Sequence, residues 1–293
     1  MQTKTVTVIG GTGFLGRYVV KLLAERGYQI RVIARDAESD HRIKTAGDVG
    51  QITLVSGDIT RPESLKGKLN NSFAVINLAG ILFERGSQTF NAVHAEGPAK
   101  LAELARQVDA ERFIHVSAIG ADSAGRSKYA RSKAVGENAV KAAFLQATIL
   151  RPSIIFGTED MFFNKFAALA CLMPFLPLIG GGLTRFQPIY VLDVAQAVMA
   201  VLERDNVQGK TFELGGPKIY SFREILEFIG KTTGRGRPLV SIPFAVAGAA
   251  ATFTGLLPDP PLTRDQVKLL RNDNVTGGTA KKTLRFGHHR TVG

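Results

Sequence analysis

The feature that most constrains the fold is a glycine-rich loop near the start of the chain. Residues 5–9 form an apolar, β-branched run typical of a strand, and the loop Gly10-Gly11-Thr12-Gly13-Phe14-Leu15-Gly16 follows it directly. The residues after the loop carry apolar side chains at helical spacing. The first glycine permits a tight turn, the middle one lets backbone N–H groups approach a pyrophosphate, and the last allows the helix to pack closely on the strand. The pattern therefore predicts a dinucleotide-binding βαβ unit.

Strands and helices alternate through the first half of the chain. Helices are predicted near Val20, Leu65, Leu101 and Val135, between most of the strands predicted at residues 4–9, 29–34, 52–56, 73–78, 112–117 and 147–151. Some of these strands are apolar almost throughout, as a parallel sheet covered on both faces requires. With right-handed crossovers, the sequence predicts an α/β fold, a doubly wound parallel sheet of the Rossmann type.

The second half of the chain predicts a smaller lobe interleaved with the sheet domain. Residues 159–183 are rich in Phe, Pro and Gly, whereas a strand, helix and strand over 187–214 are expected to belong to the sheet domain again. Further helices are predicted near 221–231, 243–257 and 263–271. We expect a dinucleotide-binding domain of residues 1–158 and 184–215, and a mostly helical C-terminal lobe of residues 159–183 and 216–293 that ends in a basic tail.

Composition narrows the class of protein. The 293 residues hold 37 Lys and Arg against 25 Asp and Glu, a net charge of +12, so the surface is strongly basic. A single cysteine, Cys171, cannot form an internal disulfide and fits a reducing compartment. Met1 leads almost at once into a strand, which leaves no room for a targeting leader, and the apolar run 242–257 is too short to span a bilayer. These features predict a cytoplasmic protein.

The end of the second strand bears on the choice of dinucleotide. Arg35 stands where an NAD-specific protein usually places a carboxylate for the ribose hydroxyls. A guanidinium suits a 2′-phosphate, so NADP(H) is favoured over NAD(H). Asp36 follows immediately and could serve the ribose instead, or only cap a turn, and Arg35 could be a solvated surface charge.

Four later segments carry a family resemblance. They are Ser56-Gly57-Asp58-Ile59, Asn77-Leu78-Ala79-Gly80, Tyr129-Ala130-Arg131-Ser132-Lys133 and Arg151-Pro152-Ser153. In this order after the glycine loop, they resemble the extended or atypical branch of the short-chain dehydrogenase/reductase superfamily. Members of this branch are similar to NAD-dependent epimerases and dehydratases. The resemblance places Asp58 at the adenine, the segment after residue 77 along the cleft, and Ser153 beside the nicotinamide. The cofactor-binding residues predicted from loop and resemblance together are Gly10, Thr12, Gly13, Phe14, Leu15, Gly16, Arg35, Asp58, Ile59, Leu78, Ala79, Gly80, Tyr129, Lys133, Pro152 and Ser153.

The candidate catalytic residues are Tyr129, Lys133 and Ser117. Four residues on a helix place Tyr129 and Lys133 on one face, so the ammonium can lie close to the phenol and is expected to lower its pKa. A phenolate could then exchange a proton with a substrate, while the hydride moves on the cofactor. The family expects a Ser or Thr near Ile119, which cannot donate a hydrogen bond, so Ser117 or the loop residues Ser123 and Ser127 remain as candidates. Whether the chain is an enzyme stays open.

The resemblance narrows further in three segments, residues 128–137, 151–157 and, above all, 261–275. They resemble the Rossmann-type accessory subunit of respiratory complex I, NADH:ubiquinone oxidoreductase. This implies a tightly bound structural NADP(H), a place at the junction of the peripheral and membrane arms, and peripheral association with the cytoplasmic face of the inner membrane. The alternative is an active NAD(P)-dependent reductase, epimerase or dehydratase that uses Tyr129 and Lys133.

Charge and apolar segments suggest partners. Residues 264–293 hold seven Lys and Arg against two Asp, next to the uncharged run 242–257. This combination fits docking on complex I subunits or an anionic membrane surface, although the run could equally be an internal helix of the small lobe. Nucleic acid is not expected, because no recognisable module or interleaved aromatic residues accompany the basic charge. No metal site is predicted, because His94, His288 and His289 lack ligand spacing with other side chains.

Overall fold

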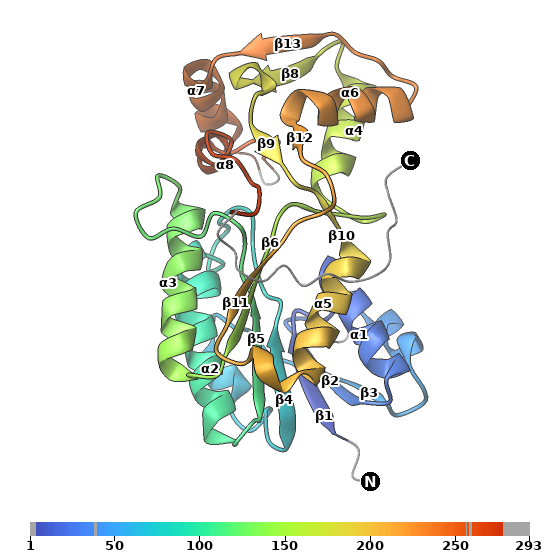
Figure 1. The fold of residues 1–293 in the computed structure, drawn as a ribbon, viewed down its shortest axis with the longest axis vertical. Coiled ribbons are helices and arrows are strands. Elements are labelled where there is room, and N and C mark those ends of the chain that lie inside the picture. The colour runs from blue at the N-terminus through green and yellow to red at the C-terminus, as the bar shows by residue number, and fades with distance from the viewer. Residues whose placement is uncertain (1–3, 38–39, 256, 258–259, 278–293) are drawn as a thin grey trace.

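The computed structural model describes residues 4–37, 40–255, 257 and 260–277, and centres on a seven-stranded sheet in the order β11-β6-β5-β4-β1-β2-β3 (Figure 1). All neighbouring strands in it are parallel. The strands are β1 Thr5–Ile9, β2 Gln29–Ala34, β3 Ile52–Ser56, β4 Ser72–Asn77, β5 Arg112–Val116, β6 Thr148–Pro152 and β11 Thr211–Leu214. The predicted doubly wound parallel sheet is confirmed.

The strand order reverses between β1 and β4. From β1 the chain continues to β2 and β3 on one side, and from β4 to β5, β6 and β11 on the other. The register pairs Ile9 with Asn77, so the loops that follow β1 and β4 start side by side. A crevice outside the carboxyl ends of the strands at such a reversal is where open α/β sheets bind ligands.

Two helical layers cover the sheet (Figure 1). Helices α1 Phe14–Glu25 and α5 Val191–Glu203 pack together on one face, and their buried faces share an apolar cluster with the sheet. The other face is covered by α2 Gly97–Gln107, which continues a π-turn, η3 Ala92–Glu96, and by α3 Lys128–Ala143. Burial on both faces explains why the central strands are apolar almost throughout.

The prediction of a helix centred near Leu65 is wrong. The connection between β3 and β4 holds only a four-residue 3₁₀ turn, η2 Pro62–Leu65. Gly67 and Asn71 adopt φ of +71° and +60°, a conformation that a right-handed helix excludes. The apolar residues of this segment are nevertheless buried against the sheet. Helical spacing of apolar residues is therefore not enough to predict a helix where residues with positive φ interrupt the chain.

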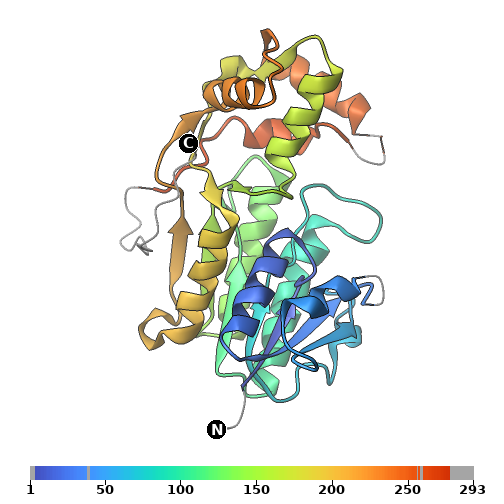
Figure 2. The same ribbon diagram turned by 90° about the vertical axis from the view of Figure 1, so that its right-hand side faces the viewer.

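A second lobe sits beyond the carboxyl edge of the sheet (Figure 2). Its helices are α4 Phe162–Leu172, α6 Phe222–Thr232, α7 Phe244–Thr254 and α8 Arg264–Leu269, and they share one apolar cluster. Two short strand pairs accompany them, β8 Leu176–Ile179 parallel to β13 Leu239–Ile242, and β9 Arg185–Phe186 antiparallel to β12 Tyr220–Ser221. The three predicted helices are present, whereas the short strands were not predicted, because prolines and few residues obscure their pattern.

The predicted strand, helix and strand over 187–214 are present as β10 Ile189–Tyr190, α5 and β11, and the two strands have different partners. Strand β11 joins β6 at the edge of the main sheet. Strand β10 pairs with β7 Ile155–Phe156 in a separate two-stranded sheet. None of the helices in the described residues is long and apolar enough to cross a membrane. Of the predicted basic tail, residues 278–293 lie outside the described part of the chain.

Helix α3 and the π-turn η3 touch backbone to backbone. A Cβ added to Gly136 on α3 would lie 1.7 Å from the carbonyl oxygen of His94 in η3. No side chain can yield to relieve that overlap, because the obstructing atom belongs to the main chain. Gly136 therefore sets the separation of α3 from the segment that precedes α2.

Gly136→Ala is expected to lower the free energy of unfolding by about 2 kcal/mol or more, because the added methyl forces the two backbones apart. The matched control is Gly248→Ala in α7, where an added Cβ would meet nothing within 4 Å. That change should raise stability by about 0.5–1 kcal/mol through helix propensity. Denaturant unfolding of both variants checks the opposite signs, and a Gly136→Ala protein as stable as wild type would contradict the packing argument.

Candidate functional site

The glycine loop lies at the strand reversal and is fixed by two close approaches of backbone. Gly10 has φ of +77°, and a Cβ there would lie 3.2 Å from the nitrogen of Ala79 in the loop after β4. A Cβ on Gly16 would lie 2.2 Å from the carbonyl oxygen of Gly10. A Cβ on Gly13, in contrast, would meet only the Gly10 oxygen, at 3.3 Å, and Gly13 is exposed. The first and last glycines therefore serve packing, and the middle one leaves the loop open.

The amino end of α1 is free of any competing side chain. Gly13 is the N-cap, no side chain accepts a hydrogen bond from this end, and the first turn holds no acidic residue. Phe14 and Leu15 in that turn are half-buried, and the Phe14 ring would lie 3.1 Å from a Cβ on Gly157. Uncapped N–H groups and the helix dipole make such an end suited to an anion.

A cavity of about 350 Å³ opens beside this loop at the end of β2. Its lining residues are Thr12, Ala34, Arg35, Asp36 and Asp40. Arg35 and Asp36 are exposed, and the Arg17 side chain donates to the Thr12 carbonyl oxygen at 3.0 Å and lies 3.5 Å from the Asp40 carboxylate. Two guanidinium groups therefore border the cavity, together with two carboxylates.

The predicted residues after β3 and β4 lie along the same edge. The Asp58 carboxylate accepts from the Thr60 N–H and hydroxyl, both at 2.9 Å, and from the Gln88 amide at 3.4 Å. Ile59 is buried, the side chain of Asn77 accepts from the Ala79 N–H at 3.1 Å, and Gly80 is exposed. Asp58 is thus part of a turn, with limited freedom to bind anything else.

Tyr129 and Lys133 come together on α3, as their spacing predicts. The Lys133 ammonium lies 5.9 Å from the centre of the Tyr129 ring and donates to the Val116 carbonyl oxygen at 3.4 Å. It would also lie 3.5 Å from a Cβ on Gly80. The ammonium therefore sits between α3, the end of β5 and the loop after β4.

The electrostatics of this pair differ from the expectation. Burial raises the pKa of Tyr129 to about 12 and lowers the pKa of Lys133 to about 8, although Glu137 acts to raise the latter. The prediction that Lys133 lowers the pKa of Tyr129 is therefore wrong. Desolvation of the phenol outweighs the attraction of an ammonium that is itself desolvated.

The candidates for a third catalytic group lie in different surroundings. Ser117 is buried at 4% exposure, and its hydroxyl has no hydrogen-bond partner among the described residues. Ile119 is buried and apolar, and Ser123 is exposed on the loop. The Ser127 hydroxyl is fully engaged, because it accepts from the Ala130 N–H and donates to Asp265 at 2.7 Å. Of the buried candidates, Ser117 is the one whose hydroxyl has no partner among the described residues.

The residues after β6 are covered by the second lobe. Pro152 and Ser153 are both buried, and the Ser153 hydroxyl donates to the side-chain oxygen of Asn274 at 2.7 Å. The hydroxyl of Ser153, which was predicted to contact a cofactor, is thus held by Asn274. Asn274 and Asp265 were missed by the sequence reasoning, although both lie in the segment 261–275 that carried the most specific resemblance.

His94 is the third residue that the sequence reasoning did not assign to the site. Its Nε2 accepts from the Ile81 N–H at 3.1 Å, so Nδ1 carries the proton and donates to the Ser132 hydroxyl at 3.0 Å. Its ring stacks on Phe90 and meets the Tyr129 ring edge to face. Burial lowers the pKa of His94 to about 2, which keeps the imidazole neutral. The π-turn that carries it is the kind of irregularity often found at functional sites.

The residues at the crevice fit a dinucleotide. The open position at Gly13 and the uncapped N-terminus of α1 suit a pyrophosphate. The cavity of about 350 Å³ lined by Arg35 suits a phosphate on the adenosine ribose. The Lys133 ammonium, beside the loop after β4, offers a donor toward the other half of the ligand. Among the residues that the structure describes, no group of three or more His, Cys, Asp or Glu could hold a metal ion.

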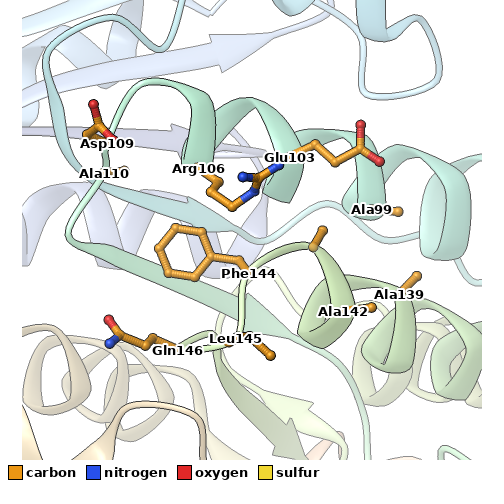
Figure 3. Close-up of a pocket in the computed structure, with 11 residues that line it drawn as sticks. Ala99, Glu103, Arg106, Asp109, Ala110, Ala139, Ala142, Phe144, Leu145 and Gln146 are labelled. Carbon is orange, nitrogen blue, oxygen red and sulfur yellow. The ribbon is translucent and has the colours of Figure 1, made fainter.

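A second hollow lies elsewhere. A groove of about 990 Å³ runs between α2 and α3 at the end opposite the crevice, where β5 and β6 begin (Figure 3). Glu103 and Arg106 border it, and five alanines contribute to its walls, Ala99, Ala110, Ala139, Ala142 and Ala143. It shares no residue with the candidate site.

Comparisons with known proteins agree with this arrangement. Residues 6–215 match the NAD dependent epimerase/dehydratase family. A relative from Arabidopsis thaliana, NADH dehydrogenase (ubiquinone) 1 alpha subcomplex subunit 9, mitochondrial, is 38% identical over 94% of this chain and 72% of its own length. A ceramide reductase from Caulobacter vibrioides is 33% identical over 87% of this chain and 80% of its own length.

The solved structures add the fold. The epimerase Mth375 from Methanothermobacter thermautotrophicus superposes with a TM-score of 0.68 at 23% identity, over 82% of this chain and 80% of that one. The sequence resemblance is confirmed by these matches. The chain belongs to the NAD dependent epimerase/dehydratase family, and within it to the group that includes subunit 9 of the complex I alpha subcomplex.

Proposed function

We propose that this chain is an accessory and assembly subunit of NADH:ubiquinone oxidoreductase, complex I, that holds NADP(H) as a structural ligand. The observation that carries the proposal is the pairing of an open glycine loop at an uncapped helix end with an apolar residue, Ile119, where turnover needs a hydrogen-bond donor. Similarity to a named complex I subunit over 94% of the chain supports the partner. A bound nucleotide would stabilise the fold by mass action.

The preference for NADP(H) over NAD(H) rests on charge. Arg35 lines the cavity beside the glycine loop, and Arg17 borders it at Thr12. A 2′-phosphate can accept paired, charge-assisted hydrogen bonds from a guanidinium, and a ribose hydroxyl cannot match them. Asp40 already lies near Arg17, which leaves Arg35 as the cation that faces the ligand.

The cofactor is proposed to be structural because the proton chemistry is unfavourable. A phenol whose pKa is about 12 is a poor base at neutral pH, and Ile119 offers no donor to a reacting oxygen. When bound, NADP(H) would supply a hydride donor, which these surroundings do not complement. In this role Tyr129, Lys133 and Ser117 position the nicotinamide half of the nucleotide.

A second candidate function is an NAD(P)-dependent reductase, epimerase or dehydratase. It is favoured by the intact Tyr129 and Lys133 pair and by the similarity to a protein named as a ceramide reductase. In that role Tyr129 would exchange a proton with a substrate hydroxyl or carbonyl. Lys133 would lie between the phenol and the ribose.

Docking is proposed to use α7, in the segment 242–257. One face of this helix, with Ala247 and Ala251, is buried in the second lobe. The opposite face is apolar and exposed, and it carries Ala245, Val246, Ala249, Ala250 and Phe253. The sequence left open whether this segment docks on a partner or packs inside the small lobe. We propose that the exposed face docks, while the opposite face packs inside the lobe.

Basic groups adjoin this apolar face. The Arg271 guanidinium lies 4.9 Å from the centre of the Phe244 ring, and α8, which packs on α7, carries Lys268. Basic residues near an anionic surface contribute about 1 kcal/mol each. We place this face against complex I subunits at the junction of the arms, or against anionic lipid, at the cytoplasmic face of the inner membrane.

Denaturation of the purified protein is expected to release NADP(H) close to one equivalent, identified by mass spectrometry. Arg35→Glu should weaken NADPH binding about 10- to 100-fold in calorimetry and leave NADH binding nearly unchanged, because only the 2′-phosphate loses its charged partner. Arg106→Glu, at the far groove, is the matched control. Equal losses for NADPH and NADH would refute the assigned preference.

No carbonyl-dependent oxidation of bound NADPH is expected above background across a panel of aldehydes, ketones and nucleotide sugars. Tyr129→Phe should then retain nucleotide within about threefold of wild type, since one neutral hydrogen bond is at stake. The assay follows NADPH absorbance together with calorimetric affinity. Turnover in wild type that Tyr129→Phe abolishes would favour the enzyme.

Lys133→Met is expected to stabilise the protein without added nucleotide, on the order of 2 kcal/mol at pH 7, while weakening NADPH binding about tenfold or more. The folded pKa of Lys133, about 8, lies below its ordinary 10.5, so protonation opposes folding. Stability from this group therefore rises as pH increases from about 8 to 10.5. Thermal unfolding across this range should show the rise in wild type and its absence in Lys133→Met; parallel curves would contradict the assignment.

A further inference from the structure

Residues 263–277 cross from the second lobe to the carboxyl edge of the sheet (Figure 1). The segment begins with α8, whose N-terminus is closed by a capping box between Thr263 and Gln266. After α8 it is anchored to its own lobe, because the Asp273 carboxylate accepts from the backbone N–H and the side chain of Arg185, both at 2.8 Å. Two other side chains of the same segment, those of Asp265 and Asn274, reach the walls of the nucleotide cleft.

Asp265 holds the first wall, which is the start of α3. Its carboxylate accepts from the Ser127 hydroxyl and the Lys128 N–H, both at 2.7 Å, and from the Tyr129 N–H at 2.9 Å. These contacts satisfy amide groups that the first turn of a helix cannot satisfy internally, and they place negative charge at the positive end of the dipole. The helix so fixed carries Tyr129 and Lys133 into the cleft.

Asn274 holds the second wall, which is the ends of β5 and β6. Its side-chain oxygen accepts from the Ser153 hydroxyl at 2.7 Å and from the Ile154 N–H at 3.0 Å. Its amide nitrogen donates to the Ile119 carbonyl oxygen at 3.4 Å. Ile119 and Ser153 follow adjacent strands, so one side chain bridges the edge of the sheet at this point.

We propose that Asp265 and Asn274 are positioning residues that clamp the nucleotide cleft, so that nucleotide leaves at the rate at which this clamp opens. A dinucleotide at the strand reversal extends from the glycine loop after β1 toward the ends of β5 and β6. Its nicotinamide half then lies between Lys133 on α3 and the residues after β6. A single segment of the second lobe holds both of these walls. The inference rests on the proposed nucleotide binding.

The clamp also links the nucleotide to the docking surface. Helix α8 packs on α7, and α7 carries the exposed apolar face. Nucleotide that orders the clamp must, by linkage, be held more tightly when a partner orders α8 from the other side. Occupancy and docking are therefore expected to reinforce each other.

The test measures NADPH release from the full chain. The protein is loaded with NADPH, mixed with excess NADP⁺, and followed by nicotinamide fluorescence. Asp265→Asn and Asn274→Ala are each expected to raise the dissociation rate constant about tenfold, since each removes hydrogen bonds, in the first case to a charged group. The association rate constant should not fall, because an open clamp does not hinder entry, whereas general damage to the site would lower it.

Arg264→Gln is the matched control, because it alters an exposed side chain of the same segment that contacts neither wall of the cleft. It should release NADPH at the wild-type rate. A second measurement needs no variant: hydrogen exchange of backbone amides in residues 264–277 of wild type should slow when NADPH is added.

The outcomes separate the two proposals. Wild-type protein that binds no NADPH or NADP⁺ overturns the proposed function and the clamp together. If wild-type protein binds NADPH but both variants release it at the wild-type rate, the clamp proposal is overturned and the proposed function stands. Unchanged exchange in residues 264–277 overturns the clamp proposal too, and this second readout decides the question even if a variant fails to fold.

Discussion

The close approach of the glycine loop to the start of the loop after β4 determines the rest of the site. A Cβ on Gly16 would lie 2.2 Å from the Gly10 carbonyl oxygen and force α1 away from its strand, and a Cβ on Gly10 would lie 3.2 Å from the Ala79 nitrogen, closer than most Cβ contacts. Because both contacts involve backbone, no rotamer change can relieve them. They aim the uncapped end of α1 at the strand reversal, and the positions of Arg35 and Ser117, which directly follow β2 and β5, depend on the register of the parallel strands.

Local patterns in the sequence were enough to predict the frame but not its tertiary contacts. The central strands and the glycine loop follow from apolar runs and from spacing within a few residues. The helix near Leu65 was predicted wrongly, because Gly67 and Asn71 adopt positive φ that apolar spacing does not reveal. The partners of Ser127 and Ser153 lie more than 100 residues away, at Asp265 and Asn274, so no local pattern could have disclosed them.

Desolvation explains why the chemistry of the Tyr129 and Lys133 pair was harder to predict than its geometry. Helical spacing places the two side chains on one face, but their pKa values depend on burial that only the packed structure supplies. The nearby Ser117 hydroxyl and His115 Nε2 are buried without partners among the described residues, which also costs stability. Two of the four such atoms in the described residues lie near the end of β5, and the other two, on Arg112 and Thr211, lie where β5 and β11 begin.

Within the proposed function, the second lobe covers the part of the cleft near the end of β5, where two of these buried polar groups lie. A dehydrogenase needs open space beside the nicotinamide for its substrate, whereas here Asn274 bridges the ends of β5 and β6 and Ile119 presents no donor. In the proposed role the Tyr129 and Lys133 pair would bind a ribose without moving protons, so its presence does not require turnover. In the proposed role, the lobe that in an enzyme would admit substrate instead retains the nucleotide. Helix α7, beside the clamp, then presents its exposed face to a partner.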